Sequence, residues 1–87
     1  MKGYKMKAEY KLQMIGEHLI AEAIRFRDSM KLNDKAFKIA KTKKEKDVFE
    51  EGSLQYRARW AVCMDMIERL GIEDEYYTAL NKHLDNK

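Results

Sequence analysis

The chain has 87 residues, of which 45% are hydrophobic, and its 18 lysines and arginines outnumber 15 acids for a net charge of +3. This length favours a single domain over residues 1–87, and the hydrophobic content excludes a disordered tail. No apolar run approaches the roughly 20 residues that cross a membrane, no signal peptide is recognisable, and one cysteine forms no intramolecular disulfide, so we expect a soluble, cytoplasmic protein.

The first third of the chain has the pattern of a long amphipathic helix. The sequence has no proline, four glycines and no Asn-Gly or Asp-Gly pair, which argues against a sheet rich in turns. From about residue 4 to 31, apolar residues recur every three or four positions and share one stripe, which predicts a helix that packs against more than one neighbour. The stripe comprises Ala8, Leu12, Ile15, Leu19, Ala23, Phe26 and Met30.

A short second helix is predicted from about residue 34 to 41. Asn33 and Asp34 are typical of a helix end followed by a new N-cap, and a polar, lysine-rich stretch follows them. Nothing in that stretch forbids helix, so continuity with the next helix stays open. A change in the phase of the apolar face favours a break, as does the capping-box pattern that Asp47 and Glu50 form.

The third and fourth predicted helices run from about 48 to 70 and from about 73 to 84. In the third, apolar residues alternate at steps of three and four, the spacing of a two-helix seam. Gly71 stands where a left-handed residue commonly ends a helix, and the last helix is expected to bury Tyr76 or Tyr77. These elements predict an all-α fold, an antiparallel hairpin of the two long helices accompanied by the two short ones.

One charged residue interrupts the apolar seam of each long helix. These residues are Glu22 in the first and Arg59 in the third predicted helix. In an antiparallel arrangement, pairing Phe26 with Tyr56 brings Glu22 level with Arg59. Because an unpaired charge on an apolar seam is strongly unfavourable, we predict a structural ion pair between Glu22 and Arg59, within one chain or across a dimer, that fixes the register.

Candidate catalytic and metal-ligating residues are few. His18 and Glu22 lie one helical turn apart, but a metal site needs about three or four protein ligands, and His83 lies on the last helix. Cys63 falls on an apolar stripe, where a cysteine is usually a small core residue rather than a nucleophile. We therefore expect no catalytic residue, no metal, no cofactor and no enzymatic activity.

The aromatic residues indicate a contact with another protein. The chain has five tyrosines and one tryptophan, which one small core cannot hide completely, and six methionines add adaptable apolar surface. These features favour a small helical protein–protein interaction module that self-associates as a homodimer or binds another protein. The predicted contact residues are Ile20, Ile24, Tyr56 and Trp60.

A lysine-rich segment supports nucleic acid as an alternative partner. Residues 31–47 hold seven lysines against three acids, a local charge of +4 that could neutralise several phosphates. The candidate contact residues are Lys41, Lys43, Lys44 and Lys46. Two glutamates near the start of the third helix oppose this reading, and a solvated loop has the same composition. Acids on the polar face of the first helix argue against binding to a membrane surface.

Overall fold

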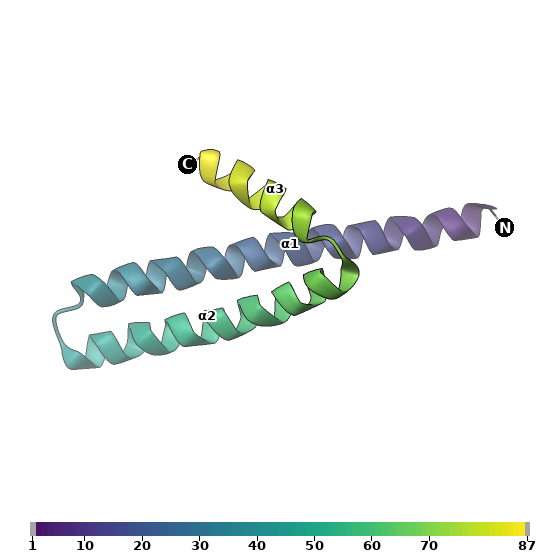
Figure 1. Cartoon of the computed structure of the whole chain (residues 1–87). Coiled ribbons are helices and arrows are strands. Elements are labelled where there is room, and N and C mark those ends of the chain that lie inside the picture. Colours follow the sequence, from purple (N-terminus) through teal and green to yellow (C-terminus); the bar gives the residue numbers. More distant parts are fainter. Residues whose placement is uncertain (1, 87) are drawn as a thin grey trace.

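The computed structural model describes the backbone of residues 2–86 and the side chains of residues 9–86. This part of the chain forms three helices and no strand, which confirms the predicted all-α class (Figure 1). The helices are α1 (Lys2–Ile39), α2 (Lys43–Leu70) and α3 (Glu73–Asp85).

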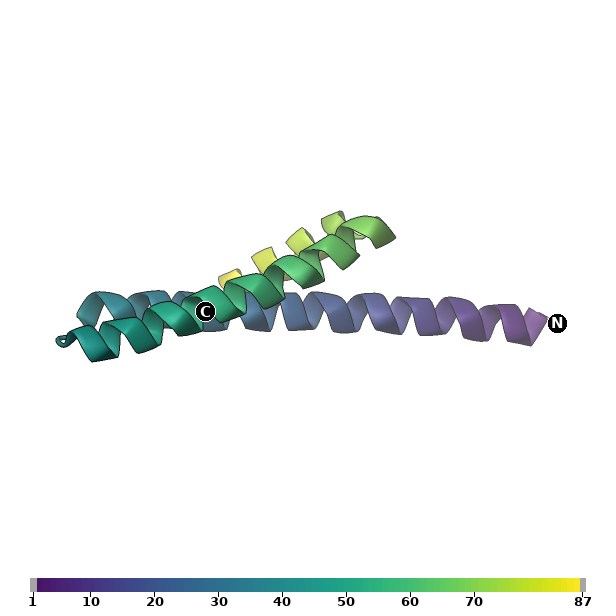
Figure 2. The ribbon, with the colours of Figure 1, turned by 90° about the horizontal axis from the view of Figure 1, so that it is seen from below.

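The first two helices form the predicted antiparallel hairpin, and the third folds back beside it. The turn at residues 40–42 joins α1 to α2, and α3 returns from the far end of α2 alongside α1 (Figure 1). The molecule measures 62 × 24 × 16 Å along its principal axes. Because α2 crosses α1 obliquely and is shorter, the N-terminal part of α1 extends beyond the end of the hairpin (Figure 2).

The separate short helix predicted at about 34–41 is wrong, since α1 continues through this region to Ile39. The two residues expected to interrupt the helix have other hydrogen-bond partners. Asn33 donates through Nδ2 to the carbonyl oxygen of Ser29 at 2.8 Å, and Asp34 accepts a hydrogen bond from the hydroxyl of Ser53 at 2.5 Å. These residues therefore join α1 to itself and to α2 instead of capping a new helix.

A glycine in α2 makes room for this contact. A Cβ atom on Gly52 would collide with the Oδ1 atom of Asn33, so the absence of a side chain lets the two helices approach at this level. Ser53, the residue that reaches Asp34, is buried. The polar pair thus joins α1 and α2 within the half of the hairpin that contains the turn.

The start of α2 also differs from the prediction. The helix begins at Lys43, and Thr42 is its N-cap, with Oγ1 accepting a hydrogen bond from the N–H of Glu45 at 3.1 Å. The expected cap at Asp47 is wrong because Thr42 and Glu45 provide the same Thr-x-x-Glu pattern five residues earlier. The predicted break before this helix is confirmed, and it divides the lysine-rich segment 31–47 among the end of α1, the turn and the start of α2.

The end of α2 follows the prediction. Gly71 has φ 70°, and its N–H donates to the carbonyl oxygen of Glu68 at 3.0 Å, while the N–H of Ile72 donates to that of Ile67 at 3.1 Å. These two bonds form a Schellman-type cap, which glycine allows without steric strain. The chain then turns directly into α3, whose first turn holds three acidic residues.

All three helices contribute to a small core. Its buried members are Ala23, Cys63, Ile67 and Tyr76. Partly buried apolar residues surround them: Leu19, Ile20, Ile24, Phe26, Trp60, Met64, Ile72 and Leu80. The predicted pairing of Phe26 with Tyr56 is confirmed, since their ring centroids lie 6.2 Å apart. Because α3 supplies Tyr76, the hairpin and α3 share one core.

Candidate functional site

The residues of the predicted ion pair have other contacts. Glu22 forms an ion pair with Arg25 on the same helix, with 2.5 Å between Glu22 Oε2 and Arg25 Nη2. The guanidinium of Arg59 lies 5.6 Å from the ring centroid of Tyr56. Among residues 9–86, no ion pair joins Glu22 to Arg59. Glu22 instead lies close enough to Cys63 to act on its thiol, one helical turn from Arg59. The predicted pair is therefore not formed within the chain.

The four residues of the predicted interface are half-buried within the chain. Ile20, Ile24 and Trp60 pack against the core, and Tyr56 stacks near Phe26. The indole Nε1–H of Trp60 donates a hydrogen bond to the hydroxyl of Tyr76 at 3.1 Å. Much of the surface expected to bind a second protein is thus already occupied by contacts within the molecule.

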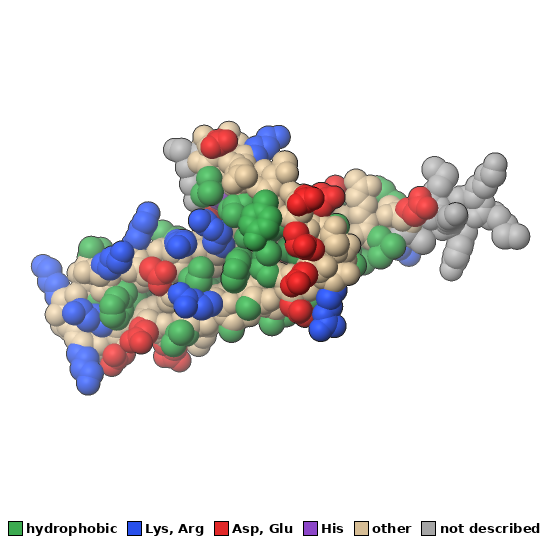
Figure 3. Space-filling view, viewed as in Figure 1, with side chains coloured by type: hydrophobic (Ala, Val, Ile, Leu, Met, Phe, Trp, Pro, Cys, Tyr) green, Lys and Arg blue, Asp and Glu red, His purple; other side chains and the backbone are tan. Residues whose placement is uncertain are grey.

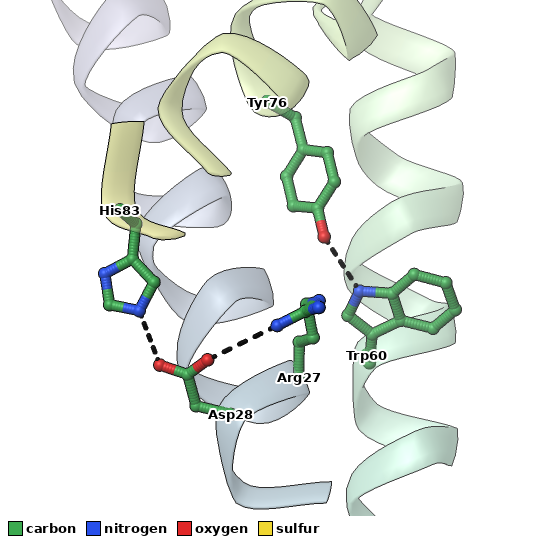
Figure 4. A network of polar contacts seen from close by, with 5 residues as sticks. All are labelled: Arg27, Asp28, Trp60, Tyr76 and His83. Atoms are coloured by element: carbon green, nitrogen blue, oxygen red, sulfur yellow. Dashed lines mark hydrogen bonds and ion pairs between the residues drawn. The ribbon is translucent and has the colours of Figure 1, made fainter. Parts of the chain in front are cut away.

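A set of polar contacts holds α3 against the hairpin (Figure 4). His83 Nε2 lies 2.7 Å from Asp28 Oδ2, and Arg27 Nη1 lies 3.6 Å from Asp28 Oδ1. Two turns before His83 in α3, the hydroxyl of Tyr76 accepts the hydrogen bond of Trp60. These contacts join α3 to both helices of the hairpin and so fix its position. Residues 9–86 hold no group of three histidine, cysteine or acidic side chains suited to a metal ion.

Cys63 lies in the core, and its sulfur is free of disulfide bonding. Burial raises the pKa of the Cys63 thiol above its usual value, and the negative charge of Glu22 raises it further. A thiol is a nucleophile only when ionised, so this environment suits a structural cysteine.

We expect Cys63 to react more slowly with iodoacetamide in the folded chain than in the chain unfolded by urea. The pKa of the Cys63 thiol is higher in the folded chain than in the unfolded chain, so protonation of the thiol favours folding. This contribution to stability is fully present below the pKa of the unfolded chain and is lost as pH rises through the pKa of the folded chain. Glu22→Gln removes one cause of the shift and should speed alkylation at mildly alkaline pH. Equal rates for the folded and unfolded chains would contradict this assignment.

An apolar groove lies where the end of α2 meets α1 and α3. Its volume is about 430 Å³. We call it the corner groove; it is lined by Leu12, Gln13, Gly16, Glu17, Ile20, Leu70, Ile72 and Glu75. Gly16 forms part of its floor: a Cβ there would lie 3.1 Å from Ile72 Cδ1, so α1 and the α2–α3 corner approach closely.

The corner groove is open because the α1 stripe continues past the end of α2. Leu12 is 59% exposed and Ile15 is 52% exposed, whereas Ala23 on the same stripe is fully buried. Across the groove, Leu70 is 46% exposed. The periodicity of the sequence placed Leu12 and Ile15 on a packing face, but the length of α2 decides whether that face is covered.

Acidic side chains gather beside the corner groove (Figure 3). Residues 65–75 contain five acids against Arg69, a net charge of −4. Three of these acids form the first turn of α3, where negative charge stabilises the exposed N–H groups. Two acidic residues, Glu17 and Glu75, line the groove itself. The apolar surface therefore has a negatively charged rim.

The four lysines predicted to contact a polyanion all lie exposed near the hairpin turn. Basic side chains surround this end of the molecule (Figure 3). The structure thus brings Lys41, Lys43, Lys44 and Lys46 together, three of them in the first turn of α2 and one in the turn that precedes it. The lysines lie at the start of α2 and the acidic residues of the corner lie at its end. Because α2 has 28 residues, it is about 40 Å long.

No helix in the described part of the chain combines the length and apolar character needed to cross a bilayer. The two candidate sites are the corner groove with its acidic rim and the exposed lysines at the hairpin turn. Comparison of the chain with protein-family models, with curated proteins and with solved structures found no match.

Proposed function

We propose that this chain is a small helical protein–protein interaction module that self-associates through the corner groove. The observation that supports the proposal is the exposed apolar surface of Leu12 and Leu70, which line the groove, together with the exposed Ile15 on the same stripe of α1. Contiguous exposed apolar surface with a polar rim is typical of protein contacts. In this proposal the chain has no catalytic residue and no cofactor, and it acts in the cytoplasm, where Cys63 stays reduced.

The contact is expected to be weak and dependent on concentration. Burying a whole leucine side chain contributes about 1.5–3 kcal/mol, so two leucines that are about half exposed contribute roughly 1 kcal/mol each. Association must also offset the loss of translational and rotational freedom. A small apolar groove therefore supports reversible assembly rather than a permanent dimer.

Sedimentation equilibrium over a series of concentrations tests this proposal. We expect the average mass of the wild-type chain to rise above 10.4 kDa as concentration increases, and Leu12→Gln to keep it near that value. Val62→Gln is the matched control, because Val62 is 62% exposed, similar to Leu12, but does not line the corner groove. A wild-type mass of 10.4 kDa at every concentration would refute self-association.

A second candidate function is nucleic-acid binding at the lysine-rich turn. Its support is the exposure of the four lysines at one end of the molecule. We expect their simultaneous replacement by glutamine to abolish any retardation of DNA or RNA in a low-salt gel and to reduce the salt dependence of binding. Replacing Lys11 and Lys82, which lie elsewhere, should have a smaller effect. Unchanged mobility with the wild-type chain would reject this function.

A further inference from the structure

The two ends of the hairpin carry opposite charge. Residues 31–47, which we call the hairpin tip, have a net charge of +4, and residues 65–75 at the corner have −4. The separation of about 40 Å along α2 is far larger than the screening length of about 8 Å at physiological salt. The two charged surfaces therefore do not neutralise each other within one molecule.

The hairpin tip also exposes apolar side chains. Ile39 is 79% exposed and Leu32 is 66% exposed. These residues are seven positions apart on α1, so they lie on the same face of the helix, two turns from each other. Lys35 lies between them in the sequence, and Lys38 precedes Ile39. The tip thus presents an apolar stripe beside positive charge. The corner groove also has an apolar surface, but its neighbouring charge is negative.

From these two surfaces we infer that the self-association proposed above is head-to-tail: the hairpin tip of one copy docks in the corner groove of the next. Ile39 and Leu32 then cover the apolar lining of the groove, and the neighbouring lysines face its acidic rim. This inference rests on the proposed function, and it identifies the hairpin tip of a second copy as the surface that binds the corner groove. Such a contact joins two different surfaces, so it repeats to form a chain of subunits or closes into a ring.

Symmetric contacts are disfavoured by charge. Two corner grooves facing each other would bring together Glu17 and Glu75 from both copies, and two hairpin tips would bring lysines together. Like charges across an interface oppose association, whereas opposite charges favour it and fix the orientation. Only the head-to-tail contact pairs the acidic rim with the lysines while burying both apolar surfaces.

Mixing two defective variants tests the inference. The corner variant carries Leu12→Gln and Glu75→Gln, and the tip variant carries Ile39→Gln and Lys38→Gln. All four residues are exposed, so both variants should fold like the wild type, which far-UV circular dichroism checks. Each variant has one intact surface, and we expect each to stay monomeric alone.

In the mixture, the intact tip of the corner variant can dock on the intact corner of the tip variant, and growth stops there. We therefore expect a 1:1 mixture to contain particles of two chains and none larger, measured by sedimentation equilibrium. The matched control is a Val62→Gln chain, which should assemble as the wild type does. Assembly of the wild type and of the 1:1 mixture should weaken as salt is raised.

Three results would overturn the inference, and they are distinguishable. If the wild type associates but the mixture stays monomeric, the contact is not head-to-tail and the proposed self-association remains. If the tip variant alone associates like the wild type, the contact is between two corners. If the wild type is monomeric at every concentration, self-association and the head-to-tail contact both fail, and retardation of nucleic acid that depends on Lys38 would assign the tip to a polyanion.

Discussion

Replacing Tyr76 with alanine is expected to lower the free energy of unfolding by about 3–5 kcal/mol, as for other large aromatic residues removed from a core. Tyr76 is 1% exposed and is one of the two largest fully buried side chains, and it comes from the helix that closes the core. Small domains are stable by only about 5–15 kcal/mol, so this loss should unfold a visible fraction of the chain. Urea denaturation followed by circular dichroism measures it.

The neighbouring tyrosine provides the control for this prediction. Tyr77 is 52% exposed, so Tyr77→Ala should change the free energy of unfolding by no more than about 1 kcal/mol. Tyr76→Phe keeps the ring and loses only the hydrogen bond from Trp60, which should cost about 1 kcal/mol. Similar losses for the two alanine variants would show that α3 does not dock through Tyr76.

Ile67 is the second residue whose replacement should have a large effect. It is fully buried in the same core as Cys63 and Tyr76, so Ile67→Ala should lower the free energy of unfolding by about 2–5 kcal/mol through lost burial and a cavity. On the same helix, Val62 is 62% exposed, and Val62→Ala should change the free energy of unfolding by about 0.5 kcal/mol or less. Equal midpoints of urea denaturation for these two variants would contradict the assigned face of α2.

Local signals in the sequence were sufficient to predict the end of α2 and the start of α3. Gly71 and the acidic residues after it act over a few positions, so no distant contact is needed to interpret them. The spacing of apolar residues likewise predicted which faces of α1 and α2 meet, and Phe26 and Tyr56 confirm it. The helix ends depend on residues within one turn, and the packing faces depend on the period of the helix, so both can be predicted from the sequence.

The start of α2 and the continuity of α1 were missed because the same residues suit two roles. Asn33 and Asp34 have side chains that cap helices, but here Asp34 bonds to Ser53, nineteen positions away. The sequence does not show which partner a polar side chain will have. The same holds for Glu22 and Arg59, which contact Arg25 and Tyr56 on their own helices although the predicted pairing of Phe26 with Tyr56 is formed.

The candidate site was only partly predictable. The stripe that contains Leu12 and Ile15 was identified from its period, but its exposure depends on where α2 ends and on how steeply it crosses α1. The direction of α3 is set by the turn at Gly71 together with the burial of Tyr76, which is a long-range contact. As a result, three of the four residues of the predicted interface pack against the core, and the open apolar surface lies at the corner groove.

The fold-back of α3 is the claim on which the account depends most, because it completes the core and forms the corner groove. Nuclear Overhauser effects in a dilute, monomeric sample test it directly. We expect cross-peaks from the indole N–H of Trp60 to the ring of Tyr76, and from the methyl group of Ala23 to the same ring. A helical α3 with neither cross-peak would show that it lies away from the hairpin and would contradict the account.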